Sequence, residues 1–125
     1  EDDVENAMVI DLSHHNGHVD FAKAKAAGVI GVIHKATQGT KFADPMYAVR
    51  RPQVEDAGLL WGAYHFGTGD DVAEQEDHFL TVAQPEPGNL VALDFEPNPP
   101  NTMSLAQAKD YLYRIQADLG RKAVL

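Results

Sequence analysis

Two acidic side chains stand two residues apart at the end of an apolar run, in the stretch NLVALDFEPNPP (89–100). An ionised carboxylate without a partner is costly to bury, so Asp94 and Glu96 are expected to face an open cleft. Side chains alternate faces along a strand, which places both acids on one face with their Cβ atoms about 6–7 Å apart. Mutual repulsion would raise at least one of the two pKa values. The pair would then offer a proton donor beside an anion, the combination that cleavage of a glycosidic bond needs.

Polar side chains end the other apolar runs as well. They are Asp11 and Ser13 in the first run, His34, Lys35 and Thr37 in the second, and Tyr64 and His65 in the third. In parallel α/β folds the chemistry gathers at the carboxyl ends of the strands. Tyr64 at such an end could stack on a sugar ring or hydrogen-bond to it. A histidine inside a strand, such as His65, is more often a hydrogen-bonded structural residue than a catalyst.

Other chemistries are weaker alternatives. Asp11 with His14, His15 and His18, in DLSHHNGH, could be drawn as a metal site together with Asp94. The spacing does not favour it, because adjacent histidines on one loop rarely reach the same metal ion. The chain has no cysteine, no glycine-rich phosphate loop and no G-x-S-x-G motif, which argues against thiol, nucleotide and serine-hydrolase chemistry. Alternatively, the acids simply cap or pair with neighbouring loops.

The elements that must position these residues alternate along the chain. Apolar strands are predicted at 7–13, 29–37, 59–66 and 89–96, and helices at 19–28, 46–58, 71–83 and 104–120, with 121–125 starting a fifth strand. Ser104 and Gly120 have the residue types of a helix N-cap and a C-terminal stop. This order predicts parallel strands with crossover helices. It fits an open doubly wound sheet or the first part of a (β/α) barrel, and a closed eight-strand barrel takes about 200 residues or more.

Composition limits the class of protein further. The 125 residues suffice for one domain, and 10 Lys and Arg against 19 Asp and Glu give a net charge of −9. No basic cluster is present to bind a phosphate backbone, so no nucleic-acid partner is expected. No stretch has the roughly 20 apolar residues of a membrane span. The start EDDVENA shows no signal peptide and could be a mature terminus; residues 1–6 are expected to be a flexible segment.

Several motifs taken together resemble the glycoside hydrolase family 25 lysozymes, the Chalaropsis-type muramidases. They are VIDLSHHNGHVDFAKAKAAGVIGVIHKATQGTKFADPMY, AGLLWGAYHFGTG and LVALDFEPN, and the likeness covers about residues 7 to 125. The resemblance implies a TIM-like parallel (β/α) barrel, here truncated after the start of the fifth strand, so that 1–125 is part of a catalytic domain. It also implies hydrolysis of the β-1,4 bond between N-acetylmuramic acid and N-acetylglucosamine in peptidoglycan, with no cofactor and no metal.

The resemblance also assigns roles to individual residues. Glu96 matches the general acid, Asp94 the assisting carboxylate, Asp11 a further active-site carboxylate and Tyr64 an aromatic residue of the cleft. Gln38, His65 and Asn98 are expected to be further substrate contacts. Many family members carry Glu where this chain has Gln38 in KATQG, so one negative charge is missing from the cleft. Whether the reaction is retaining, inverting or substrate-assisted is left open by the spacing of the two acids.

The sequence thus predicts a secreted, extracellular or cell-envelope lysozyme whose partner is the glycan strand of peptidoglycan. An open barrel would leave an apolar strand edge through which chains could self-associate. The alternatives are a non-catalytic module that binds cell-wall glycan, a metal-dependent hydrolase, and a hydrolase that acts on chitin.

Overall fold

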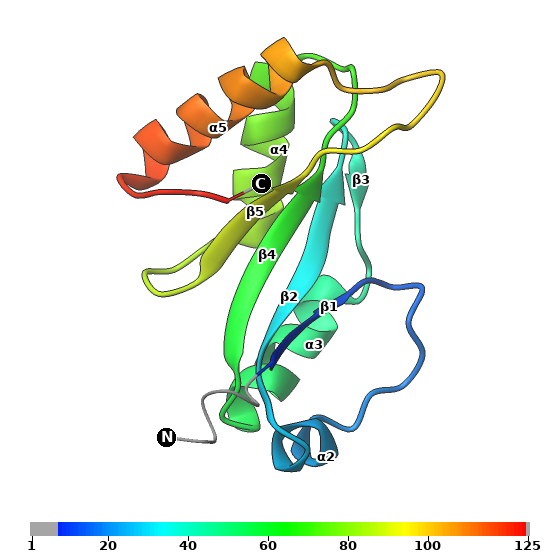
Figure 1. Cartoon of the computed structure of the whole chain (residues 1–125), viewed down its shortest axis with the longest axis vertical. Helices are drawn as coiled ribbons and strands as arrows, with labels where there is room; N and C mark the ends of the chain where they lie inside the picture. Colours follow the sequence, from blue (N-terminus) through cyan, green and yellow to red (C-terminus); the bar gives the residue numbers. More distant parts are fainter. Residues whose placement is uncertain (1–7, 125) are drawn as a thin grey trace.

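The computed structural model describes residues 8–124. The segment 1–6, predicted to be flexible, lies outside the described residues. Strands and helices alternate along the chain (Figure 1). They are β1 (Met8–Leu12), α2 (Phe21–Ala26), β2 (Val29–Gln38), β3 (Phe42–Ala43), α3 (Tyr47–Asp56), β4 (Leu60–Phe66), α4 (Val72–Ala83), β5 (Leu90–Asp94) and α5 (Leu105–Leu119). Between residues 8 and 124, no helix is long and apolar enough to cross a membrane.

The main strands run parallel in the order β1-β2-β4-β5, which confirms the predicted parallel α/β sheet. The two-residue strand β3 pairs antiparallel with the end of β2. It was not predicted, because two residues carry no alternation pattern. Beside β5, Val124 donates to the Val91 carbonyl at 3.0 Å and accepts from the Leu93 N–H at 2.9 Å. The predicted fifth parallel strand is therefore represented, within the described residues, by a single bridge.

The helix ends follow the local signals in the sequence. Ser104 caps α5: its hydroxyl accepts from the Gln107 N–H at 3.1 Å, and its own N–H donates to the Gln107 side chain at 2.9 Å. Gly120 ends the same helix with a φ of 69°, a left-handed conformation that glycine adopts without strain. Asp20 and Asp71 cap α2 and α4 through a side-chain oxygen. Both predicted ends of α5 are confirmed, and its reciprocal cap fixes the chain where it leaves the loop after β5.

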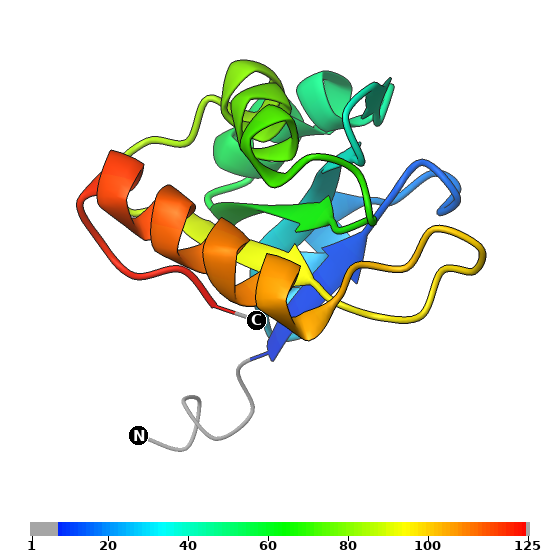
Figure 2. The same ribbon diagram turned by 90° about the horizontal axis from the view of Figure 1, so that it is seen from above.

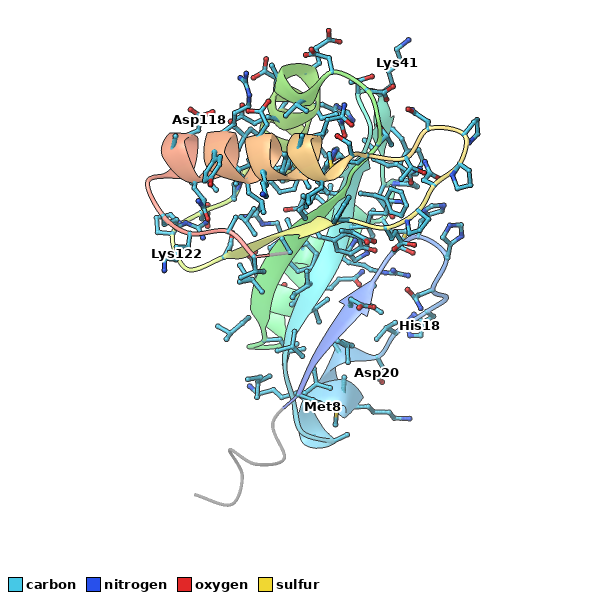
Figure 3. The ribbon with its side chains drawn as sticks, turned by 45° about the horizontal axis from the view of Figure 1, so that its top comes forward. Met8, His18, Asp20, Lys41, Asp118 and Lys122 are labelled. Carbon is cyan, nitrogen blue, oxygen red and sulfur yellow. The ribbon has the colours of Figure 1, made fainter. Side chains whose placement is uncertain are left out.

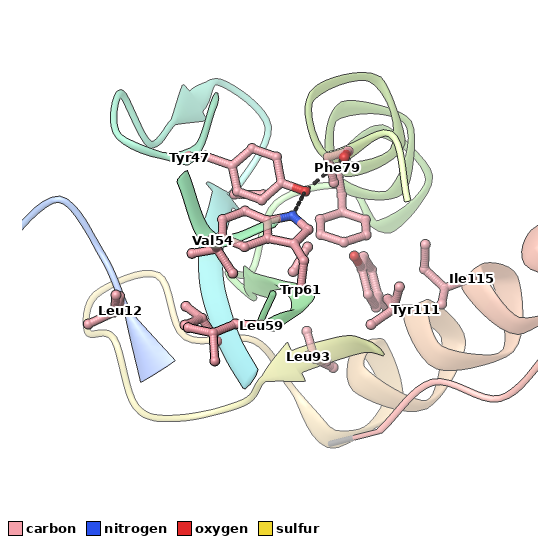
Figure 4. Close-up of a cluster of buried hydrophobic side chains, with 14 of the residues drawn as sticks. Leu12, Tyr47, Val54, Leu59, Trp61, Phe79, Leu93, Tyr111 and Ile115 are labelled. Carbon is pink, nitrogen blue, oxygen red and sulfur yellow. Dashed lines mark hydrogen bonds between the residues drawn. The ribbon is translucent and has the colours of Figure 1, made fainter. Parts of the chain in front are cut away.

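The hydrophobic core lies between the sheet and the helices. Figure 2 shows α3 and α4 on one side of the strands, with α5 alongside β5. Trp61 of β4 donates from Nε1 to the Tyr47 hydroxyl at 3.2 Å, and that hydroxyl donates to the Ala83 carbonyl at 2.8 Å (Figure 4). Phe79 and Ile115 fill the space between the helices and are fully buried. This packing joins β4, α3 and α4 into one block and so holds the strand ends in place.

The opposite face of the sheet has no helix packed on it among the described elements. Val9, Leu60 and Leu90 lie on this uncovered face and expose 51%, 65% and 41% of their surface. Together with Gly31 and Gly62 they line a shallow apolar hollow. A Cβ atom at Gly62 would stand 3.0 Å from the Leu90 carbonyl oxygen, so glycine lets β4 and β5 run close together. The uncovered face continues along the strands to their carboxyl ends.

Candidate active site

A cleft of about 630 Å³ opens at the carboxyl ends of the strands. Parallel strands end at the same edge of a sheet, and alternate residues face the same way. For these reasons β1 brings Asp11, β4 brings Tyr64 and β5 brings Asp94 to one place, and Glu96 joins them from the loop that follows β5. The full lining is Asp11, Ile33, Tyr64, Ala92, Leu93, Asp94, Phe95 and Glu96.

Asp94 and Glu96 line this cleft side by side. The strand β5 ends at Asp94, so the predicted strand ran two residues too far and Glu96 lies beyond it, exposed. Hydrogen bonding between the two carboxyl groups requires a proton on one of them, and it is one of the effects on the pKa of Asp94. Burial, this hydrogen bond and repulsion from Glu96 raise the pKa of Asp94 to about 6. In weakly acidic solution the pair therefore holds one proton and one negative charge.

Tyr64 stands in the cleft between β2 and β5. Burial, followed by the charges of Asp11 and Asp94, raises the pKa of its phenol to about 12. The hydroxyl therefore stays protonated and can donate a hydrogen bond to an oxygen of a bound ligand. Its half-buried ring also offers an apolar face to a sugar.

Arg50 of α3 fixes the loop that follows β1. This side chain is only 4% exposed. Its Nη1 donates to the Ser13 carbonyl at 2.8 Å, and its Nη2 donates to the carbonyls of Asn16 at 2.7 Å and Gly17 at 3.0 Å. Nη1 also donates to Nε2 of His34 at 3.2 Å, whose pKa is lowered by burial. The guanidinium group thus ties residues 13–17, and with them the end of β1, to α3 and β2.

Asp44 holds the same loop from a second direction. Its buried carboxylate accepts from the N–H groups of His14 and Met46, both at 2.8 Å, and lies 3.0 Å from Nδ1 of His14. Burial by itself would raise the pKa of Asp44, but these hydrogen bonds hold it below its usual range. His15 and His18 are exposed on the loop, and Figure 3 shows His18 there. Within residues 8–124 no three side chains of the kinds that bind metals are gathered together, so the arrangement required by the metal-dependent alternative is not formed.

The structure places His65, one of the predicted substrate contacts, away from the cleft. Neighbouring strand residues face opposite ways, so His65 points under the helices while Tyr64 faces the cleft. The buried ring has Nδ1 2.7 Å from Thr37 Oγ1 and Nε2 2.8 Å from Gln75 Oε1, and it stacks on Tyr111. Burial lowers the pKa of His65 to about 4. His65 is therefore a neutral residue that supports the sheet. It does not line the cleft, where a sugar contact was predicted for it.

Gln38 and Asn98, two other predicted contacts, line a second and polar pocket of about 400 Å³. It lies over the loops that follow β2, β4 and β5. Asp70 joins two of these loops, because it accepts from Asn101 Nδ2 at 3.1 Å and from the Thr68 hydroxyl at 2.9 Å. Apart from His65, the predicted contact residues are therefore divided between the acidic cleft, which holds Tyr64, and this polar pocket.

Lys35 was noted at a strand end but was given no role from the sequence. It is 7% exposed, and its Nζ donates to Gln38 Oε1 at 2.5 Å. The same Nζ lies 5.2 Å from the ring centroid of Phe42 and 5.0 Å from that of Phe66. The available signal was a lysine inside an apolar strand, since lysine is almost never fully buried unless it is paired.

The fold and the cleft define an α/β protein with an acidic site at the carboxyl ends of parallel strands. The chain belongs to the family described as glycosyl hydrolases family 25, whose model matches residues 10–125. This membership confirms the resemblance seen in the sequence motifs.

Among curated relatives, lysozyme M1 of Streptomyces globisporus is 30% identical over 110 residues, which are 81% of this chain and 36% of that protein. The N,O-diacetylmuramidase of Chalaropsis sp. is 33% identical over 75 residues, 56% of this chain and 36% of that protein. The chain spans 22% to 36% of the length of the curated relatives it matches.

Solved structures share the fold. The muramidase from Acremonium alcalophilum superposes with a TM-score of 0.81 at 26% identity, covering 91% of this chain and 62% of that one. The family GH25 lysozyme from Aspergillus fumigatus gives a TM-score of 0.80 at 27% identity, covering 94% of this chain and 63% of that one.

Proposed function

We propose that this chain is part of a lysozyme catalytic domain that hydrolyses the β-1,4 bond between N-acetylmuramic acid and N-acetylglucosamine in peptidoglycan. The observation that carries the proposal is the pair of Asp94 and Glu96 in the lining of an open cleft, where the pKa of Asp94 is raised. Glycosidic cleavage needs a proton donor next to an anion. Family membership and relatives named lysozyme and N,O-diacetylmuramidase support this choice of substrate.

Glu96 is the proposed general acid and Asp94 the assisting carboxylate. Glu96 is the more exposed of the two, so it can reach the oxygen of the glycosidic bond and protonate it as the bond breaks. Asp94 is proposed to steady positive charge on the sugar or to orient the substrate's own N-acetyl group as the nucleophile.

Asp11 and Tyr64 complete the proposed catalytic cleft. Asp11 adds negative charge opposite the pair, which favours the positive charge that develops on the sugar ring in the transition state. Tyr64 supplies a protonated hydroxyl and an aromatic face for the sugar. Gln38 and Asn98 are proposed to contact a neighbouring part of the glycan in the polar pocket. No cofactor or metal takes part in this scheme.

The sheet is proposed to be the first part of a TIM-like (β/α) barrel whose other strands lie outside these 125 residues. Three observations support this proposal: the uncovered apolar face, the bridge at Val124 beside β5, and the coverage of only 62% of the Acremonium muramidase structure. The open edge next to β5 is also where copies of the chain would associate. The site of action is proposed to be the cell envelope or the extracellular space, where peptidoglycan lies.

The test is clearance of a peptidoglycan suspension by the wild-type chain and by Glu96→Gln. Losing a general acid lowers the rate by about a hundredfold or more, so Glu96→Gln is expected to be nearly inactive. Glu86→Gln is the matched control, because Glu86 is exposed and far from the cleft. Equal clearance by wild type and Glu96→Gln would refute the proposed acid.

A module that binds glycan without cleaving it is the second candidate. It is favoured because the chain covers only 62% of the Acremonium muramidase structure. Pull-down with insoluble peptidoglycan separates the two candidates. Binding without clearance, lost in Tyr64→Ala, would identify a binding module that uses the same cleft. Parallel assays on chitin decide whether the muramic acid unit is needed.

A further inference from the structure

The ammonium group of Lys35 occupies a defined position beside the acidic cleft. Lys35 pairs with Tyr64 in the register of β2 and β4, and alternation places it on the same face as Ile33, which lines the cleft. Its Nζ lies over the rings of Phe42 and Phe66, 5.2 and 5.0 Å from their centroids. A cation over two aromatic faces is stabilised by both. The side chain is thereby kept from moving freely.

This ammonium group is near carboxylates but touches none of them. Within residues 8–124, Lys35 forms no ion pair within 4.0 Å, and its Nζ donates instead to the uncharged Gln38 side chain. The charged groups that face it are Asp44, after β3, and Asp94 and Glu96, at the end of β5. Tyr64, which stands between Lys35 and β5, is neutral.

We propose that Lys35 is a positioning residue for the Asp94–Glu96 pair: its ammonium group, held over the rings of Phe42 and Phe66, acts on the pair through space and takes up none of the carboxyl oxygens. A lysine in direct contact would occupy an oxygen that the substrate needs. A charge held at a distance instead favours one negative charge on the pair while the other carboxyl group keeps its proton. The inference rests on the proposed function only in that this pair performs the chemistry.

The positive charge of Lys35 stabilises the ionised form of Asp94. The charge of Lys35 lowers the pKa of Asp94 and opposes the effects of burial and of Glu96. Burial lowers the pKa of Lys35, while Asp44, Asp94 and Glu96 act to raise it. Gln38 matters here, because a carboxylate at that position would form an ion pair with Lys35 and cancel most of its field at the pair.

The first test is a ¹³C NMR titration of the carboxyl groups of Asp94 and Glu96, in the absence of substrate. Lys35→Met removes the charge and keeps the apolar stem. It is expected to raise the titration midpoint of Asp94 by about one pH unit, whereas Lys35→Arg, which keeps the charge, restores the wild-type midpoint. Lys41→Met is the matched control, since Lys41 is exposed and does not line the cleft. A folded Lys35→Met protein with unchanged midpoints would overturn the proposal.

A second variant tests the contact with the rings if Lys35→Met does not fold. Phe42 is 39% exposed, so Phe42→Leu removes one of the two rings with little effect on the core. The released ammonium group is expected to move toward the acids and lower the midpoint of Asp94. An unchanged midpoint would count against the role of the rings and hence against the proposal.

The activity measurement distinguishes this inference from the proposed function. In an active enzyme, Lys35→Met is expected to shift the pH–rate profile to higher pH by the same number of pH units as the titration midpoint of Asp94. A purely structural role would lower the rate at every pH without moving the profile, and that result would overturn the inference. If no glycan is cleaved but the titration shifts as described, the proposed function fails while the electrostatic coupling stands.

Discussion

Glu76 of α4 faces Asp118 of α5 closely enough for the charge and hydrogen bonding of Asp118 to raise the pKa of Glu76. Glu76 is 4% exposed, and its Oε2 has no hydrogen-bond partner among residues 8–124. Burial, the contact with Asp118 and the negative charge of Asp118 raise the pKa of Glu76 to about 7. A proton therefore takes part in the contact between these two helices.

The stability of the chain should depend on this proton. Because the pKa of Glu76 is raised from 4.5 to about 7 on folding, its favourable contribution is complete below about pH 4.5 and is lost as pH rises through 7. Glu76→Gln cannot ionise, so it is expected to be about 2 kcal/mol more stable than wild type at pH 8 and little different at pH 5. Urea unfolding at both pH values measures the effect.

The control for this variant is Glu74→Gln, at an exposed position of the same helix. It is expected to change stability by the same small amount at both pH values. If wild type and Glu76→Gln lost the same stability between pH 5 and pH 8, the contact between α4 and α5 would not depend on the proton.

The raised pKa of Asp94 predicts the pH dependence of catalysis. Above about pH 6 the pair loses the proton that the reaction needs, so the rate of peptidoglycan cleavage should fall about tenfold for each further pH unit. In Asp94→Asn the hydrogen bond no longer depends on a shared proton. The fall near pH 6 is then expected to move, together with a lower maximal rate. A wild-type rate that stays flat from pH 5 to 8 would show that the shared proton is not the catalytic one.

Arg50 is expected to be essential for the order of the loop after β1. Arg50→Met leaves the carbonyls of residues 13, 16 and 17 without their donor and should cost about 2 kcal/mol of stability. Amide hydrogen exchange in residues 13–17 should become faster. Arg50→Lys should not restore slow exchange in residues 13–17, because a single ammonium group cannot reach all of these carbonyls.

Arg114→Met is the matched control for the loss of an arginine. Arg114 pairs with Asp110 on the surface of α5, where both side chains are about half exposed, so its loss is expected to cost under about 1 kcal/mol. Unchanged exchange in residues 13–17 of Arg50→Met would contradict the role given to Arg50.

Two glycine substitutions test the close approach of β4 and β5. Gly62→Ala places a Cβ atom 3.0 Å from the Leu90 carbonyl oxygen and 3.1 Å from its Cβ, and it is expected to cost about 2 kcal/mol. For a domain of this size that corresponds to a Tm lower by about 8 °C. Gly17→Ala is the control, because a Cβ atom there meets nothing within 4 Å. A Tm difference within about 2 °C between the two variants would show that the strands can separate at little cost.

Much of the fold followed from local patterns. Apolar strands and helices closed by glycine predicted the alternation of strands and helices, and the signals at Ser104 and Gly120 predicted both ends of α5. The strand that carries the acids was drawn too long because Phe95 and Glu96 continue its alternation of apolar and polar residues. What ends β5 at Asp94 is the loss of pairing with β4, whose last residue, Phe66, pairs with Asp94. A single sequence does not show that partner.

The part of the site that depends only on the geometry of parallel strands could be predicted from the sequence. Asp11, Tyr64 and Asp94 meet because parallel strands end at one edge of the sheet. The same alternation that turns Tyr64 into the cleft turns His65 out of it, so adjacent strand residues should not both have been expected to contact substrate. The contacts of Arg50 with residues 13–17 join positions more than 30 residues apart, and no local pattern predicts them.

The uncovered face of the sheet also affects the electrostatic environment of the acids in the cleft. Leu90, Ala92 and Asp94 follow one another on the same side of β5, in steps of about 6.6 Å, so the apolar surface and the acid belong to one wall. Any segment that packs on Leu90 and Leu60 also excludes water from beneath Asp94. The lower local dielectric would strengthen both the repulsion from Glu96 and the attraction of Lys35. Covering this face would therefore tune the acidity of the pair from a distance, without touching either carboxyl group.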